Sequence, residues 1–191
     1  YLQNIHQFRR ESFAHTLKDA VSAVFGWDRD LLEGRTKESR VWREQVDPWW
    51  AERLRMPDLT PRWVLQYWGT DVFRNHFHND IWVASVENKL RQTKDDIVIT
   101  DCRFANEVKA IKSAGGITCR VYRGENPVWY QSAIDYNKGV RQIGWALGKD
   151  VLDKNKVHPS EYSWVGTDFD AVLVNDGTID DLYQQVERSV L

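Results

Sequence analysis

The sequence predicts a three-layer α/β domain that carries a helical insertion. Strand patterns alternate with an amphipathic helix in the second half of the chain, whereas the first half reads mainly as helix. The stretches "DIVIT" (96–100) and "ITCRVYR" (117–123) have strand patterns, and a helical pattern over 105–114 separates them. A β-α-β crossover of this kind implies a parallel pair of strands. "DAVLVND" (170–176) predicts a third strand, followed by a helix over 178–191.

The first half of the chain reads as helix after a short strand pattern at 8–14. The helical patterns span residues 15–26, 36–56, 60–77 and 79–93. Gly26 suits a C-terminal cap of the first helix, and Pro48 interrupts the second, which is charged and rich in tryptophan. Thr60, with a proline directly after it, and Asp80 are N-caps for the last two. We therefore expect an α/β core from residues 1–26 and 91–191, a helical insertion over 27–90, and a polar loop region over 124–169.

Composition and charge exclude several classes of protein. The net charge of -2 gives no basic surplus for binding a nucleic-acid polymer, although a few arginines suffice for a small anion. No apolar run approaches the roughly 18 residues of a membrane span, and the opening "YLQNIHQFRRESF" is too polar for a secretory signal. Two cysteines fit a reducing cytosol. We expect a cytoplasmic protein that does not bind membranes.

Polar side chains follow two of the predicted strands. Asp101 and Arg103 come after the strand at 96–100, and Asn175 and Gly177 close the last strand. Ligands of open parallel sheets bind at the carboxyl ends of the strands. A guanidinium there presents a planar fork to phosphate or carboxylate, and Glu107, one helical turn past Arg103, is spaced to pair with it. The alternative interpretation is a surface ion pair at the start of a helix.

A second group of candidates lies in "RWVLQYWGTD" (62–71). Arg62 and Gln66 are four residues apart and share a helix face. Gly69 admits close approach of a backbone, Thr70 offers a hydroxyl, and Trp82 offers a flat wall for a ligand. The alternative is a packed helix with a glycine kink, and the pattern by itself leaves both interpretations open.

Other side chains read first as ordinary surface groups. Lys18, Arg40 and Arg43 are typical of solvated helix faces, although the two arginines are spaced to close over a phosphate. "HFH" at 76–78 is not a metal site, because residues two apart do not face each other on a helix. Cys102 has no phosphate-cradling loop after it, so we do not expect a thiolate nucleophile.

Four blocks of the sequence, in this order, resemble the deoxynucleoside monophosphate kinases of tailed bacteriophages. The blocks are "SFAHTLKDAVSAVFGW", "RWVLQYWGTDVFRNHFHNDIW", "VITDCRFANEVKAIKSAGG" and "VLVNDGTIDDL". The resemblance covers most of the chain, and its specific part is "QxxGTD…W" followed by "DxRxxxE". A weaker similarity is to animal-type phosphomevalonate kinase.

This resemblance implies a P-loop kinase fold that moves the γ-phosphoryl group of ATP, with Mg²⁺, onto a deoxynucleoside monophosphate. It implies an acceptor site formed by Lys18, Arg62, Gln66, Gly69, Thr70, Trp82, Asp101, Arg103 and Glu107. Asp101 and Arg103 would act at the reacting phosphate, and Asn175 and Gly177 would border the adenine of ATP. The helical insertion would be the lobe that closes over the acceptor. A phage-encoded chain would work in the host cytoplasm, and a homodimer is left open.

The sequence departs from the resemblance at one motif. G-x-x-x-x-G-K-[ST], the loop that cradles ATP phosphates, does not occur in the 191 residues. We expect its strand and loop upstream of residue 1. The alternatives are a nucleotide-binding protein without the loop, or a kinase for another phosphorylated metabolite such as phosphomevalonate. The residues also leave open which arginine moves onto the transferring phosphoryl group: Arg40, Arg43, Arg123 or Arg141.

Overall fold

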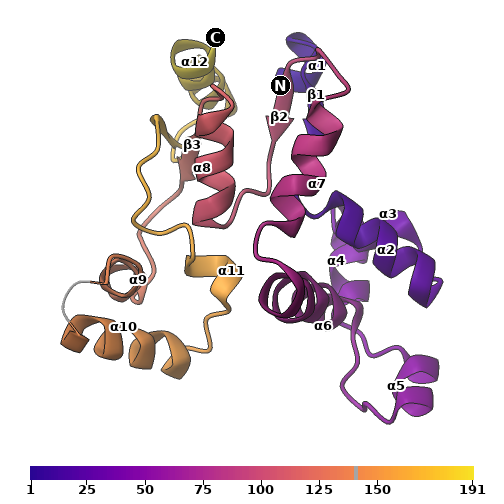
Figure 1. Cartoon of the computed structure of the whole chain (residues 1–191). Helices are drawn as coiled ribbons and strands as arrows, with labels where there is room; N and C mark the ends of the chain where they lie inside the picture. Colours follow the sequence, from indigo (N-terminus) through magenta and orange to yellow (C-terminus); the bar gives the residue numbers. More distant parts are fainter. Residues whose placement is uncertain (140–141) are drawn as a thin grey trace. The chain divides into compact units, whose positions relative to one another are not determined.

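Residues 1–139 and 142–191 are described by the computed structural model (Figure 1). They fall into two units, one of residues 2–101 and one of residues 102–191 together with Tyr1. The predicted helical insertion, 27–90, lies in the first unit. Arg141 lies outside the described residues. In the part of the chain that the structure covers, no helix is both long and apolar enough to cross a lipid bilayer.

The strands of the described residues form two separate parallel pairs. In the first unit β1 (Arg9–Glu11) pairs with β2 (Ile97–Ile99), and in the second unit β3 (Cys119–Tyr122) pairs with β4 (Ala171–Val174). The four strand patterns and their parallel direction are thus confirmed. The expected pairing of β2 with β3 joins strands of different units, so it stays a prediction. The chain is α/β with short parallel strands, and the single three-layer sheet stays a prediction.

Helices make up most of the first unit (Figure 1). They are α1 (Leu2–Ile5), α2 (His15–Phe25), α3 (Arg29–Glu33), α4 (Lys37–Arg43), α5 (Pro48–Leu54), α6 (Pro61–Gln66), η1 (Tyr67–Phe77) and α7 (Ile81–Leu90). Two of the predicted caps hold: Gly26 ends α2, and the Thr60 hydroxyl accepts a hydrogen bond from the Trp63 amide at 3.1 Å. Asp80 stands directly before α7, but its side chain makes no cap hydrogen bond to that helix. The break near Pro48 is confirmed, since α5 begins there. The short α3 was not predicted. Asp28 caps it, accepting from the amides of Asp30 and Leu31.

The segment predicted as one helix over 60–77 changes its winding part-way. After α6 the chain continues as the π-helix η1, and the His78 amide donates to the Phe73 carbonyl five residues back at 2.8 Å. π-Turns are rare and occur frequently at functional sites. The block "GTD", which carries the resemblance, lies in this wider helix.

Tryptophans of the first unit form an aromatic core. Phe25 stacks on Trp27 with ring centroids 4.3 Å apart, and Trp50 meets Phe25 edge-on at 4.8 Å. The indole N–H groups find acceptors: Trp27 donates to Asp47 Oδ2 at 2.7 Å and Trp50 donates to the Phe25 carbonyl at 3.0 Å. Burial of these rings is therefore compatible with their polar atoms, and the rings serve packing here.

The second unit contains helices where the sequence predicted a polar loop. Within 124–169 lie α9 (Tyr130–Asn137), α10 (Gln142–Lys154) and α11 (Pro159–Tyr162); the unit also has α8 (Ala105–Ser113) and α12 (Ile179–Val190). The loop prediction is therefore wrong. The reason is tertiary packing: Ala133, Leu152, Tyr162 and Val165 bury one another in a small core. A Cβ on Gly148 would lie 2.6 Å from the Ser132 carbonyl oxygen, so this glycine permits α9 and α10 to approach closely.

Truncation of Leu152 tests this core. Leu152 is fully buried, whereas Leu147 on the same helix is 62% exposed. We expect Leu152→Ala to lower the free energy of unfolding of the second unit by roughly 2–5 kcal/mol, because a cavity replaces the side chain. Leu147→Ala should change it by less than about 0.5 kcal/mol. Urea unfolding followed by circular dichroism measures both. Equal effects of the two variants would contradict the helical core over 124–169.

Candidate functional site

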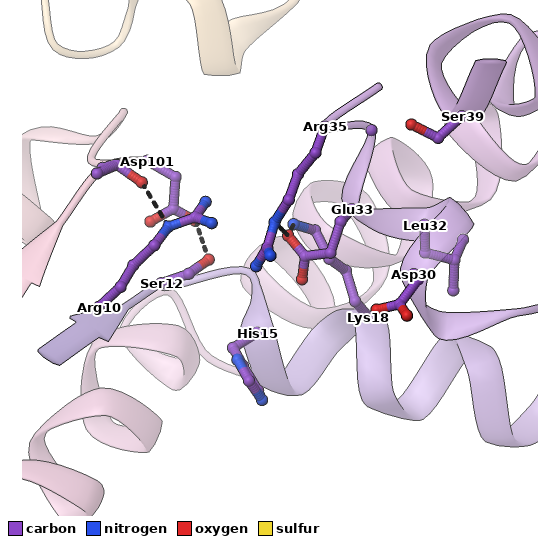
Figure 2. A network of polar contacts seen from close by, with 12 residues as sticks. Arg10, Ser12, His15, Lys18, Asp30, Leu32, Glu33, Arg35, Ser39 and Asp101 are labelled. Carbon is purple, nitrogen blue, oxygen red and sulfur yellow. Dashed lines mark hydrogen bonds and ion pairs between the residues drawn. The ribbon is translucent and has the colours of Figure 1, made fainter. Parts of the chain in front are cut away.

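The carboxylate of Asp101 holds the backbone turn that leads into α2 (Figure 2). Its Oδ2 accepts hydrogen bonds from the Ser12 hydroxyl at 2.6 Å and from the Ala14 amide at 2.9 Å, and its Oδ1 accepts from the Phe13 amide at 3.0 Å. The amides at the start of a helix lack intrahelical partners, and this carboxylate provides them from the end of β2. Asp101 thus positions the beginning of α2, and with it Lys18 one turn further on.

Lys18 and Glu33 form a half-buried ion pair between α2 and the end of α3 (Figure 2). Lys18 Nζ lies 3.0 Å from Glu33 Oε2, and Arg29 Nη1 lies 2.5 Å from Glu33 Oε1. The side chains of Lys18 and Glu33 are 13% and 10% exposed. Arg35 approaches the same carboxylate at 3.9 Å, and Arg29 also pairs with Asp19 at 2.6 Å. One carboxylate therefore faces three cations.

These cations lower the pKa of Glu33. Burial by itself raises the pKa of this carboxyl, but hydrogen bonds from Arg29 and Lys18 outweigh burial and bring the pKa to about 2. The carboxylate therefore stays charged at any physiological pH. Since the pKa is lower in the folded chain than in the unfolded chain, the ion cluster stabilises the fold above the ordinary pKa of 4.5 and loses that effect as the pH falls toward 2.

Three further arginines gather beside this cluster. Arg43 lies at the end of α4, and its pKa is lowered by burial and then by the positive charge of Arg62. Arg62 Nε lies 3.2 Å from Glu44 Oε1, and Arg40 Nη1 donates to the Arg35 carbonyl at 3.0 Å. The charge of Arg40 also lowers the pKa of Arg43, so the like charges act on one another. In this region the basic side chains outnumber the carboxylates that face them.

The residues predicted around "QYWGTD" lie on α6, η1 and α7. Gln66 is half-buried at the end of α6, and Thr70 is buried in η1. A Cβ on Gly69 would lie 2.8 Å from Leu17 Cδ2, so this glycine lets η1 pack closely on α2. The indole of Trp82 is 6% exposed and donates to the Gly69 carbonyl at 2.8 Å. In this structure Trp82 fixes the backbone of Gly69 and exposes little of its ring.

Arg103 and Glu107 lie at the start of α8 in the second unit. Glu107 is 1% exposed, and its Oε2 accepts from the backbone amides of Arg103 at 2.7 Å and Phe104 at 3.1 Å. The Arg103 guanidinium pairs instead with Glu161 Oε1 at 2.6 Å, where both side chains are about half exposed. The predicted side-chain pair of Arg103 with Glu107 is therefore wrong: Glu161 takes the guanidinium, and Glu107 instead binds the backbone amides and stabilises the helix start.

Asn175 and Gly177 lie in the loop after β4. The Asn175 amide donates to the Tyr122 carbonyl at 2.8 Å, which continues the β3–β4 ladder. Gly177 leads directly into α12, whose first turn is capped by Asp181 and Thr178. The loop is fixed to the end of β3, because Asp176 Oδ1 accepts from the Gly124 amide at 2.7 Å.

An open groove of about 510 Å³ lies elsewhere in the second unit, between α8 and residues 166–168. Lys112 on its wall pairs with Asp170 at 3.1 Å, and Lys109 and Asp168 also line it. None of the predicted site residues lines this groove.

Sequence reasoning missed Glu33, Arg29 and Arg35. These residues lie on or beside α3, a five-residue helix that the periodicity did not reveal. A usable signal was present in "DRDLLEGR", where an aspartate cap and a glycine cap enclose one helical turn. The convergence of Arg29 and Lys18 on Glu33 depends on how α3 packs against α2.

The chemistry open to this region is binding of a small anion. Several guanidinium groups with few carboxylates suit a phosphate, and none of the side chains named here has the arrangement of a nucleophile with its base. The described residues contain no group of three or more histidine, cysteine, aspartate or glutamate side chains placed to hold a metal ion. They also lack the loop motif that cradles ATP phosphates. The basic residues named here thus suit the binding of one phosphate group.

Two comparisons with known proteins agree with one another. The family model described as Deoxynucleotide monophosphate kinase matches residues 53–135. A protein of Acanthamoeba polyphaga mimivirus, which carries the provisional name deoxynucleotide monophosphate kinase, is 26% identical over 201 residues. The match covers 97% of this chain and 84% of the mimivirus protein. The resemblance noted in the sequence is confirmed by both.

The ion cluster at Glu33 yields a prediction for stability. We expect Glu33→Gln to lower the free energy of unfolding at pH 7 by roughly 2–3 kcal/mol, because Lys18 and Arg29 lose a charged acceptor in a half-buried place. The variant should also lose less stability than the wild type between pH 4.5 and pH 2, the interval in which Glu33 takes up its proton. Urea unfolding at several pH values measures both effects.

Asp30→Asn is the matched control for this prediction. Asp30 lies on the same helix and is exposed, so its loss should cost at most about 1 kcal/mol. An equal effect of the two variants, or an unchanged acid sensitivity in Glu33→Gln, would show that Glu33 does not organise the cluster.

Proposed function

We propose that this chain, which resembles the deoxynucleotide monophosphate kinases, phosphorylates deoxynucleoside monophosphates to diphosphates at the expense of ATP. In that reaction an oxygen of the acceptor's phosphate forms a bond to the γ-phosphorus of ATP, and the bond from that phosphorus to the β-phosphate oxygen breaks, which releases ADP. ATP supplies the phosphoryl group, and Mg²⁺ would neutralise its oxygens. The residues described here account for the acceptor side of the reaction.

The observation that carries this proposal is a local excess of positive charge where α2, α3, α4 and the start of α6 meet. Six basic side chains lie around the end of α3, the end of α4 and the start of α6: Lys18, Arg29, Arg35, Arg40, Arg43 and Arg62. Among the described residues Glu33, Asp19 and Glu44 form ion pairs with them, and the charge of Arg40 also acts on Glu38. A phosphate monoester carries close to two negative charges at neutral pH, so it would balance this excess.

Phosphoryl transfer requires positioning and charge stabilisation more than covalent chemistry by the protein. We assign Lys18 and Arg62 to the acceptor's phosphate. Asp101 acts on this site through the backbone turn at 12–14, which fixes the start of α2. Gly69, with Trp82 bonded to its carbonyl, fixes η1 against α2. The same residues would therefore hold the acceptor in a fixed position. Positioning of this kind supplies much of the rate enhancement in such reactions.

For the predicted site residues of the second unit, we propose the roles that the resemblance implies. Arg103 is a half-exposed guanidinium available to an anion, and Glu107 holds the backbone beneath it. Asn175 and Gly177 stand in a loop fixed to the end of β3, which is a suitable place to border a base. The resemblance supports these assignments.

The alternative to a kinase is a protein that binds nucleotides without transfer. The 191 residues contain no G-x-x-x-x-G-K-[ST] motif, the loop that normally supplies backbone amides for ATP phosphates. Calorimetry with each deoxynucleoside monophosphate, in parallel with an assay of ADP formation, distinguishes the two functions. ADP formed only when the acceptor is present supports the kinase; binding without ADP supports the second function. Phosphomevalonate as an alternative acceptor tests the remaining possibility of a metabolite kinase.

Arg103 gives the sharpest test by mutation. We expect Arg103→Ala to reduce turnover by about 10²–10³-fold, the usual effect of losing a group that stabilises transition-state charge. Its fold should persist, because a half-exposed ion pair contributes only ~0–1 kcal/mol. Glu161→Gln removes the same ion pair but keeps the guanidinium, so its turnover should stay near that of the wild type. A folded Arg103→Ala with wild-type turnover would remove Arg103 from the reaction.

A further inference from the structure

The guanidinium of Arg43 lies directly against the backbone of Gly34. A Cβ on Gly34 would be 2.2 Å from Arg43 Cζ, 2.2 Å from Nη2 and 2.7 Å from Nη1. Gly34 ends α3 in the left-handed conformation, with φ of 68°. Any side chain at this position would occupy the space that the guanidinium fills. The place of the Arg43 side chain therefore depends on the absence of a side chain at Gly34.

The protein itself provides few hydrogen-bond partners for the Arg43 guanidinium. Arg43 Nε is enclosed and has no hydrogen-bond partner among the described residues, and Nη1 reaches the Leu32 carbonyl at 3.5 Å, the limit of a hydrogen bond. No carboxylate forms an ion pair with Arg43 in that part of the chain: Glu44 pairs with Arg62, and Glu33 with Lys18 and Arg29. A half-buried cation with this environment is costly unless something else supplies negative charge.

The charged neighbours of Arg43 indicate which kind of anion would supply the missing negative charge. Arg62 and Arg40 act on Arg43 as like charges, and Glu44 and Glu33 act on it as opposite charges. Both carboxylates form their ion pairs with other cations. A single carboxylate ligand would leave the group positive, whereas a phosphate monoester brings nearly two negative charges. The planar fork of an arginine also matches two oxygens of a terminal phosphate. These features favour a phosphate monoester over a carboxylate.

We propose that Gly34 and Arg43 form a seat for the terminal phosphate of the acceptor nucleotide. This inference rests on the proposed function and adds two residues to its acceptor site. Arg43 contacts the phosphate, together with Arg62. Gly34 is a positioning residue: it contributes no contact of its own, and it holds Arg43 in place by leaving room for the guanidinium.

Gly26 provides a matched control for Gly34. Both glycines end a helix with φ of 68°, but a Cβ on Gly26 would meet nothing within 4 Å. Alanine in this left-handed conformation is strained at either position. The extra contact at Gly34 is with the far end of a flexible side chain, which can move aside. Gly34→Ala and Gly26→Ala should therefore be destabilised to a similar degree, and only Gly34→Ala should displace Arg43.

The experiment measures binding of a deoxynucleoside monophosphate by calorimetry, with inorganic phosphate as competitor, in the wild type and both variants. We expect Gly34→Ala to bind the nucleotide about tenfold more weakly or worse, to raise its KM with little change in kcat, and to lose competition by phosphate. Gly26→Ala should bind as the wild type does. Equal affinities in Gly34→Ala and Gly26→Ala would overturn the proposal.

Substitution of Arg43 provides a second measurement if Gly34→Ala does not fold. Arg43→Ala should weaken binding at least as much as Gly34→Ala, and Arg43→Lys should restore part of it, because the charge returns without the fork. If Arg43→Ala binds the nucleotide with wild-type affinity and the wild type is an active kinase, the phosphate site at Gly34 and Arg43 is overturned and the proposed function is not. A wild type that neither binds nor phosphorylates any deoxynucleoside monophosphate would overturn the proposed function itself, and the seat with it.

Discussion

The hydrogen bonds of Asp101 are the contacts on which the first unit depends. This carboxylate ends the strand β2 and receives the Ser12 hydroxyl and the two amides before α2. It thereby joins the parallel pair β1–β2 to the helix that carries Lys18. Those amides would otherwise need water or another acceptor, because a helix start cannot satisfy them internally. The direction in which α2 leaves the strands, and so the place where Lys18 meets Glu33, follows from this junction.

In the proposed function, the charges beyond that junction serve a ligand more than they serve stability. Glu33 neutralises Lys18 and Arg29 well enough to bring its own pKa to about 2. The arginines on the other side of Gly34 are neutralised less completely. Burial and neighbouring positive charge lower the pKa of Arg43. Like charges held together in a half-buried place cost free energy that a purely structural surface would avoid. Such a cost is typical of binding sites, where the ligand supplies the missing charge.

The predicted site residues separate into two kinds by their contacts. Trp82 and Glu107 are buried, and their polar side-chain atoms form hydrogen bonds with the protein's own backbone, as those of Asp101 do. Lys18, Arg62 and Arg103 keep charged groups in exchangeable ion pairs with single carboxylates. The first kind fixes helix starts and close helix contacts, and the second kind is available to an anion. A sequence motif of this length therefore combines residues that bind with residues that hold the binding groups in place.

The sequence by itself determined the strands, their parallel direction, most helix boundaries in the first half and the resemblance to the nucleotide kinases. These features depend on local signals such as Thr60 before a proline, Gly26 after an apolar helix face, and spaced motif residues. Only the tertiary structure decided that β2 pairs with β1, that residues 124–169 bury a helical core, and that Arg43 rests on Gly34. Strand neighbours, the burial of Ala133 against Leu152, and the convergence of charges from α2, α3 and α4 are contacts between residues distant along the chain. Local periodicity cannot encode them, because their free energy arises only when the elements pack.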